Sequence, residues 1–280
     1  MVKQVGLCIA LLAPLGAAAT PAGLTASTAS AGQLAPKTPE GLPQCHQLLV
    51  PTSDLPRGAG ESIRYVVDVN GLSVGVIDFR IERQGSFGGQ PVTEYRSLFK
   101  LDGLLASFVP IEGRAAALVP QLGFAPVAAM NSYKLDTNSF EENVTYSGDG
   151  RELESKRVRN GKPKEEQRAF SSPAMDFVSG FYAMRAMPVE SHGCTIIYGN
   201  QRAYTVWVDH QGRDRVKTPV GMKDADRYAI RYASEKAKEP LSGAIWLSSG
   251  ADRVPYRVVI EGKDQHLEAK IHLYETAKKR

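Results

Sequence analysis

The sequence lacks the motifs that most often reveal an enzyme. It contains no His-Glu-x-x-His zinc motif, no phosphate-binding P-loop and no dinucleotide fingerprint. The charges are nearly balanced, with 34 basic and 30 acidic residues. The basic residues are also scattered along the sequence. Nucleic acid is therefore not expected as a partner. Long apolar runs are missing as well, so we expect no transmembrane helix after the first residues.

The first 31 residues have the pattern of a signal peptide. Lys3 precedes an apolar stretch, Gly6–Leu15, which is too short to span a bilayer. Ala29-Ser30-Ala31 matches a cleavage site, with Ala17-Ala18-Ala19 as a competing one. We therefore expect residues 1–31 to be removed and the mature protein to reach the periplasm without stable membrane insertion. An uncleaved anchor is the less favoured alternative.

Cysteine is scarce, and only Cys45 and Cys194 remain after this cleavage. In an exported protein, an even number of cysteines predicts a disulfide. His46 and His192 lie beside them, so a zinc site is an alternative, although the spacing differs from that of zinc fingers. A thiol nucleophile and two free thiols are further alternatives. We expect no metal and no cofactor.

Three segments follow the predicted signal peptide. Residues 32–60 are rich in proline and polar residues, which predicts an extended arm pinned at Cys45. Residues 61–275 alternate between apolar and polar positions, which is typical of β-strands, and we interpret them as a single β domain. Residues 276–280 are a basic tail, expected to be a solvated end.

Turn signals divide the β domain into about ten short strands. Asn70-Gly71 between two alternating runs is a strong hairpin signal. The apolar parity changes between Val76 and Ile77, next to Gly75, which predicts a bulge there. Residues 102–130 are small and apolar and predict either a short helix near Leu104 or Ala115, or a covering loop. Three further segments are expected to be turns, namely residues 84–91, 160–167 and 210–214.

One helix is predicted near the middle of the chain, from Ser172 to Pro188. Ser172 is the expected N-cap and Pro173 the first helical residue, a position that tolerates proline. Gly180 is costly inside a helix, which indicates a close backbone contact there. The fold class we expect is mainly β, with a long curved antiparallel sheet, an open barrel or spiral, wrapped around this one central helix.

Four stretches together resemble the DUF3108 family of exported bacterial proteins. They are the hairpin at residues 60–75, the helical residues 176–185, the strand pair at 194–204 and the hairpin at 244–257. Members of that family often carry a second cysteine near the segment 228–232, which this sequence lacks. The resemblance implies a periplasmic, mostly β protein with no settled activity.

Two functions are weighed for such a protein. The first is a binding, carrier or interaction module for a lipid, an acyl chain, a peptide or an envelope protein. Its candidate lining residues are Phe177, Phe181, Tyr182, Met184, Trp207 and Trp246. The alternative is that these side chains only fill the core, as buried aromatic residues commonly do. The second function is an envelope glycan- or lipid-acting hydrolase that uses acidic residues such as Asp209. We identify no catalytic residue and favour the binding module.

Overall fold

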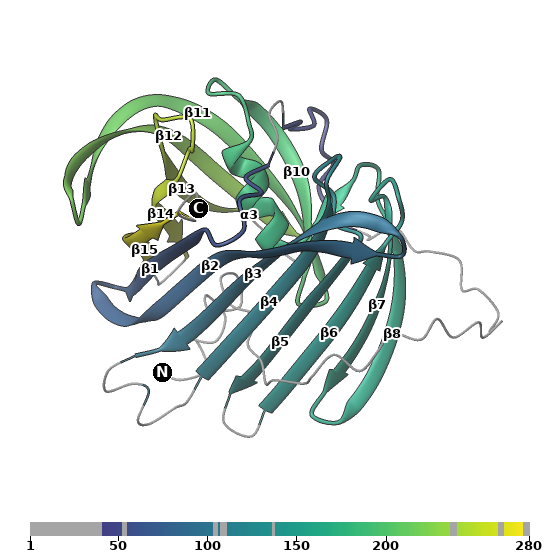
Figure 1. The fold of residues 1–280 in the computed structure, drawn as a ribbon. Coiled ribbons are helices and arrows are strands. Elements are labelled where there is room, and N and C mark those ends of the chain that lie inside the picture. Colours follow the sequence, from purple (N-terminus) through teal and green to yellow (C-terminus); the bar gives the residue numbers. More distant parts are fainter. Residues whose placement is uncertain are drawn as a thin grey trace.

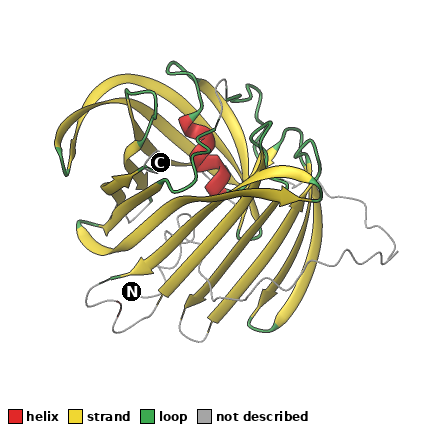
Figure 2. Cartoon of the chain, in the orientation of Figure 1, coloured by secondary structure: helices red, strands yellow, loops and turns green. Residues whose placement is uncertain are grey.

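The computed structural model describes residues 41–51, 55–102, 106, 111–135, 138–235, 240–262 and 266–276. The predicted signal peptide, the start of the arm and all of the tail except residue 276 lie outside these ranges. The described residues form fifteen strands and the α-helix α3, Phe177–Arg185 (Figures 1 and 2). The strands are β1 Ser62–Val69, β2 Leu72–Phe87, β3 Gln90–Leu101, β4 Ile111–Pro120, β5 Ala128–Leu135, β6 Asn138–Tyr146, β7 Glu152–Arg159, β8 Lys162–Ala169, β9 Ala174–Met175, β10 His192–Gly199, β11 Arg202–Thr218, β12 Gly221–Ser234, β13 Leu241–Ser248, β14 Pro255–Glu261 and β15 His266–Glu275.

All fifteen strands belong to one sheet. Its order is β8-β7-β6-β5-β4-β3-β2-β1-β15-β14-β13-β12-β11-β10-β9, so the first and last long strands pair in the middle and β8 and β9 form the edges. Every pairing is antiparallel except that of β9 with β10. The sheet curves around α3, which lies between its two halves in Figure 2. The predicted fold class, a curved antiparallel sheet around one helix, is confirmed.

Alternation of apolar and polar residues explains why the strands bury one face. In β6, every second residue from Phe140 to Tyr146 is buried, including the polar Glu142, while Glu141, Asn143 and Thr145 are exposed. In β1, Ile63 and Tyr65 are at most 1% exposed and belong to the largest apolar cluster. A strand with one dry face suits an antiparallel sheet that covers a core on one side only.

The bulge in β2 lies two residues before the predicted place. Val67 pairs with Gly75 and Asp68 pairs with Ser73, so Val74 is the extra residue. The sequence signal was misread because Ile77, Asp78 and Phe79 are all buried, which breaks simple alternation. Gly75 instead permits a close approach of β3, because a Cβ there would lie 2.3 Å from the Lys100 carbonyl oxygen.

Several predicted turns and loops are strands. Residues 84–91 extend β2 and β3 around a Gly88-Gly89 turn, residues 162–169 form β8, and residues 210–214 continue β11 past a bulge. In place of a helix or loop at Ala115, residues 111–120 form β4, and β5 follows; Leu104 lies outside the described residues. These segments are polar or alanine-rich, and only pairing with neighbouring strands makes them extended.

The helix begins later than predicted. Asp176, not Ser172, is the N-cap, and it accepts hydrogen bonds from the backbone nitrogens of Val178 and Ser179. Pro173 lies before the helix, and Ala174 and Met175 instead pair with β10 as strand β9. The pattern that favoured a longer helix therefore covers a short strand and a helix of nine residues.

Candidate functional site

Helix α3 is held at its start by a buried acidic cap. The Asp176 carboxylate accepts from the Val178 nitrogen at 2.7 Å and from the Ser179 hydroxyl at 2.5 Å. Burial raises the pKa of Asp176, and these hydrogen bonds oppose the rise. Two backbone donors that a helix start leaves unpaired are thus satisfied inside the core. The helix start is therefore fixed in position.

The end of the helix is held by a buried ion pair. Arg185 donates through both terminal nitrogens to Glu61, at 2.6 and 2.9 Å, and also to the backbone carbonyl of Asp252. The Arg185 and Glu61 side chains are 1% and 9% exposed. A cation near a helix C-terminus is favourable, and a bidentate pair fixes its direction. The ion pair therefore connects the end of the helix to Glu61, the residue directly before β1.

Between these two anchors, α3 presses closely onto the sheet. A Cβ at Gly180 would lie 2.7 Å from the Ile197 side chain of β10, so the close neighbour is a side chain and not the backbone that we expected. This contact holds the helix against β10, and both Gly180 and Ile197 lie at the edge of a cavity.

An apolar cavity of about 170 Å³ lies on one side of the helix. Its wall combines the helix with β10–β14 and the N-terminal arm. The lining residues are Leu49, Pro51, Met175, Phe177, Gly180, Phe181, Ala183, Met184, Met187, Thr195, Ile197, Val206, Ile230, Tyr232, Gly243, Val258, Val259 and Ile260. Only Thr195 and Tyr232 bring polar side chains. Such a surface can bind an apolar group but offers little to a polar one.

A second cavity of about 150 Å³ lies beside the first. Both are lined by Phe177, Phe181 and Val258, which therefore separate them. The Phe181 ring stacks on Phe79 with ring centroids 3.9 Å apart. Phe177 and Phe181 are only partly buried, so the partition between the cavities consists of rings at the edge of the core.

The N-terminal arm closes one end of the first cavity. Leu48 and Cys194 form a short parallel bridge, in which the Leu49 nitrogen donates to the Cys194 carbonyl at 2.8 Å. Cys45 and Cys194 form a disulfide, with 5.6 Å between their Cα atoms. Leu49, 6% exposed, is thereby held in the cavity wall. The predicted disulfide is confirmed, and a disulfide is typical of an extracytoplasmic compartment.

The structure brings three of the six predicted lining residues to the cavity. Phe177, Phe181 and Met184 line it from the helix. Tyr182 points elsewhere, is fully buried, and packs on Tyr95 with ring centroids 4.4 Å apart. The spacing of apolar residues on the helix could not show which of its sides faces empty space.

The two tryptophans do not line the cavity, which corrects the expectation. Trp246 lies with Val216 and Val259 in a separate cluster, between Arg227 and Arg257, whose guanidinium carbons are 5.5 and 4.6 Å from its ring. The guanidinium carbon of Arg231 lies over the Trp207 ring, 5.6 Å from its centroid. The reason is strand geometry, because successive side chains face opposite sides and the neighbours Val206 and Ile245 face inward.

Sequence reasoning missed the aliphatic part of the wall. Ile197, Val206, Ile230 and Val258 come from four different strands. Val206, Ile230 and Val258 lie at alternating apolar positions, whereas Ile197 follows another buried isoleucine. Nothing local distinguishes an inward residue beside a cavity from one in a filled core.

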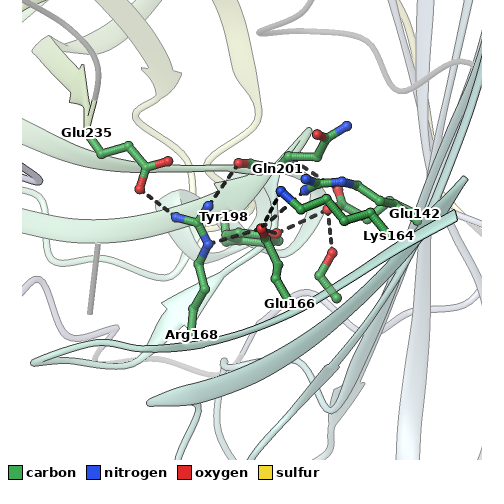
Figure 3. Close-up of polar contacts among 9 residues, drawn as sticks. Glu142, Lys164, Glu166, Arg168, Tyr198, Gln201 and Glu235 are labelled. Carbon is green, nitrogen blue, oxygen red and sulfur yellow. Dashed lines mark hydrogen bonds and ion pairs between the residues drawn. The ribbon is translucent and has the colours of Figure 1, made fainter. Parts of the chain in front are cut away.

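A partly buried polar cluster joins the two ends of the curved sheet (Figure 3). The Tyr198 hydroxyl of β10 lies 3.1 Å from Glu142 of β6 and 3.0 Å from Glu166 of β8. Arg168 of β8 donates to Glu235 at 2.5 Å and to the Gln201 carbonyl at 3.3 Å. These contacts connect the edge strand β8 with the end of the sheet that carries β10 and β12. We call this cluster the clasp.

Two of the three acids of the clasp, Glu142 and Glu166, have pKa values shifted in opposite directions. Glu142 is fully buried, and its burial raises its pKa against the hydrogen bonds from Ser155 and Tyr198. Burial acts in the same sense on Glu166, but Arg168 and Arg157 outweigh it and hold the pKa of Glu166 below its usual value. Carboxyl pKa values pushed apart are common in acid–base sites. Here both groups are occupied in joining strands, and neither lines the two cavities described.

Asp209, the acidic residue singled out from the sequence, lies on the surface. It forms an ion pair with His192, and the two side chains are 58% and 54% exposed. Among the described residues, no group of three or more His, Cys, Asp or Glu is placed to hold a metal. No described helix is long and apolar enough to cross a membrane.

The fold and the cavity together define a barrel-like β protein whose described part encloses the helix α3 and an apolar internal site. The chain belongs to the DUF3108 family, described as proteins of unknown function, whose model matches residues 64–272. The resemblance noted in the sequence is thereby confirmed. No curated protein sequence matches the chain.

The solved structures that are similar to the chain include the following two. A β-barrel-like protein of the domain of unknown function DUF1849 from Brucella abortus has a TM-score of 0.54 and 11% identity, over 80% of this chain and 100% of that one. A protein with a YmcC-like fold from Bacteroides fragilis has a TM-score of 0.37 and 9% identity, over 82% of this chain and 100% of that one. The first likeness supports the barrel-like fold and nothing further.

Proposed function

We propose that this protein is a periplasmic binding module that holds an apolar chain, such as part of the acyl chain of a lipid, in the cavity beside α3. The observation that carries the proposal is the composition of the wall, in which sixteen of eighteen lining residues have no polar side-chain atom other than the sulfur of methionine. Burying a polar group in such a wall is costly, whereas an apolar group gains about 0.8 kcal/mol per buried CH₂.

The size of the cavity narrows the ligand class. An apolar cavity of about 150 Å³ is known to accept a benzene-sized molecule, whereas drug-sized ligands occupy about 300–1,000 Å³. A cavity of about 170 Å³ therefore suits a short segment of a narrow apolar chain. A peptide would bring backbone polar groups that this wall cannot satisfy, so we favour the acyl chain over the peptide.

The disulfide and the signal-peptide pattern support the proposed location in the periplasm. The Cys45–Cys194 bond forms and persists in an oxidising compartment, and the first 31 residues have the features of an export signal. A carrier in the periplasm would shield an apolar chain from water. The buried acids of the clasp are better explained as structural connections than as hydrolytic groups, because they join strands.

The test measures the affinity of the mature protein for straight-chain fatty acids of increasing length by displacement of a fluorescent fatty acid. We expect affinity to rise about fourfold for each added CH₂ until the cavity is full, following about 0.8 kcal/mol per CH₂. Native mass spectrometry of protein purified gently from the periplasm would identify a bound chain. Affinity that does not depend on chain length would contradict the proposal.

A matched pair of variants locates the site. Val206→Phe places a ring in the wall of the cavity and is expected to weaken binding at least tenfold. Val158→Phe makes the same change on β7, where the side chain is 43% exposed, and should leave affinity unchanged. Equal affinity of both variants and the wild type would place any bound chain elsewhere.

A further inference from the structure

The β11–β12 hairpin extends beyond the sheet that supports it. β10 pairs with β11 only as far as Asp209, and β13 pairs with β12 only from Ala225 onward. The two strands nevertheless pair with each other to Thr218 and Gly221. Residues 215–224 are therefore a two-stranded ribbon that pairs laterally with no other described strand, and Figure 1 shows it curving away from the body of the protein.

The tip of this ribbon is apolar and exposed. Val220 is 78% exposed and Met222 is 49% exposed, and Pro219 beside them is exposed as well. The turn itself is held by Thr218, whose hydroxyl donates to the Gly221 carbonyl at 2.8 Å. Exposed turns are usually built from Gly, Asn, Asp or Ser, so the turn geometry does not account for two large apolar side chains.

Unpaired cations flank the apolar tip. Lys217 lies directly opposite Met222, and Lys223 lies opposite Val216. In the described part of the chain neither lysine has a salt bridge, whereas the nearby acid Asp224 faces Arg215 at 3.8 Å. Across residues 213–224 there are four basic residues and two acidic ones. The tip thus combines an apolar end with an excess of positive charge.

We infer that the tip of the β11–β12 hairpin docks on the surface of an anionic lipid bilayer. Val220 and Met222 enter the boundary between head groups and acyl chains, while Lys217 and Lys223 attract the negative surface. Apolar side chains flanked by cations are the combination that binds membrane interfaces without spanning them. This interaction surface lies outside the cavity, and the inference does not depend on the proposed ligand.

The experiment is co-sedimentation of the mature protein with phosphatidylcholine vesicles, with and without one quarter phosphatidylglycerol. We expect binding to the anionic vesicles and a loss of at least fivefold in the bound fraction for Val220→Ser/Met222→Ser. Lys217→Gln/Lys223→Gln should weaken binding similarly. Circular dichroism confirms that each variant is folded.

Two matched controls test whether the tip itself binds. Leu72→Ser removes an apolar side chain that is 71% exposed at another hairpin turn, and it should bind as the wild type does. Lys100→Gln/Lys134→Gln removes two exposed cations from β3 and β5 and should have a much smaller effect than the tip pair. Equal losses in the control and tip variants, or equal binding of the wild type to neutral and anionic vesicles, would overturn the inference.

The vesicle-binding experiment can be distinguished from the test of fatty-acid binding in the cavity. The tip variants should keep the wild-type affinity for fatty acids, and Val206→Phe should keep the wild-type binding to vesicles. Absence of vesicle binding by the wild type would also overturn the inference, while leaving the cavity to be tested by the fatty-acid titration.

Discussion

Both terminal nitrogens of Arg185, at the end of α3, donate to the carboxylate of Glu61, although 124 residues separate the two. The pair lies in the core, where each charge alone would be poorly solvated. It connects the helix to the start of β1, in the middle of the sheet, and so fixes the helix that forms one wall of the cavity.

Breaking this pair should be strongly destabilising. Glu61→Leu or Arg185→Met alone leaves an uncompensated buried charge, and we expect a loss of about 3–5 kcal/mol in the free energy of unfolding. The double variant should recover most of that loss, because no buried charge remains. Urea denaturation of the four proteins measures the coupling, and additive losses would contradict this account.

Replacing the capping carboxylate of Asp176 by an amide should destabilise the protein less than removing the capping group. Asp176→Ala removes the acceptor of two backbone nitrogens and should cost about 1–2 kcal/mol. Asp176→Asn keeps an acceptor and removes a carboxyl whose pKa is raised by burial, so its loss should be smaller at pH 7. Thermal unfolding of the two variants compares them directly. A loss for Asp176→Asn as large as that for Asp176→Ala would contradict this account.

The disulfide should stabilise both the fold and the cavity. Cys45 and Cys194 are 149 residues apart, so the chain-entropy model gives a contribution of about 5 kcal/mol at most. Cys45→Ser/Cys194→Ser should lose about 2–5 kcal/mol and bind fatty acids more weakly, because Leu49 is no longer held in the wall. A reductant should lower the melting temperature of the wild type and leave that of the variant unchanged.

The clasp should make stability depend on pH through Glu166. Its folded-state pKa is lowered, so its ionised form stabilises the fold above the unfolded pKa of about 4.3. That contribution is lost as pH falls through the folded pKa. Glu166→Gln should therefore be less stable than the wild type at pH 6, and the difference should shrink toward pH 3. The midpoints of urea unfolding of the wild type and the variant, measured between pH 6 and pH 3, test this prediction.

Glu142 should affect the pH dependence of stability in the direction opposite to Glu166. Burial raises its pKa, so its ionised form opposes folding at neutral pH, and its protonation partly offsets the acid-induced loss from Glu166. A pH profile of the Glu166→Gln variant that is flat or rises slightly on mild acidification would agree with this. A profile as steep as that of the wild type would show that other groups control the acid response.

Local patterns predicted the elements whose signals are short-range. Asn70-Gly71 predicted the β1–β2 hairpin, and both residues have the positive φ angles that the turn requires. By contrast, β8 is charged almost throughout, and β4 contains three alanines in a row. Both are strands because a neighbouring strand supplies hydrogen bonds, which no local pattern encodes.

The sequence by itself determined the fold class, the pairing of two cysteines and the place of the one predicted helix, because alternation, residue counts and apolar spacing are local properties. The tertiary structure decided where the chain is hollow and what joins its ends. Tyr198 meets Glu142 and Glu166 only when the sheet curves around α3. Trp246 faces away from the cavity that Val258 lines, because bulges and strand register set which face each residue occupies.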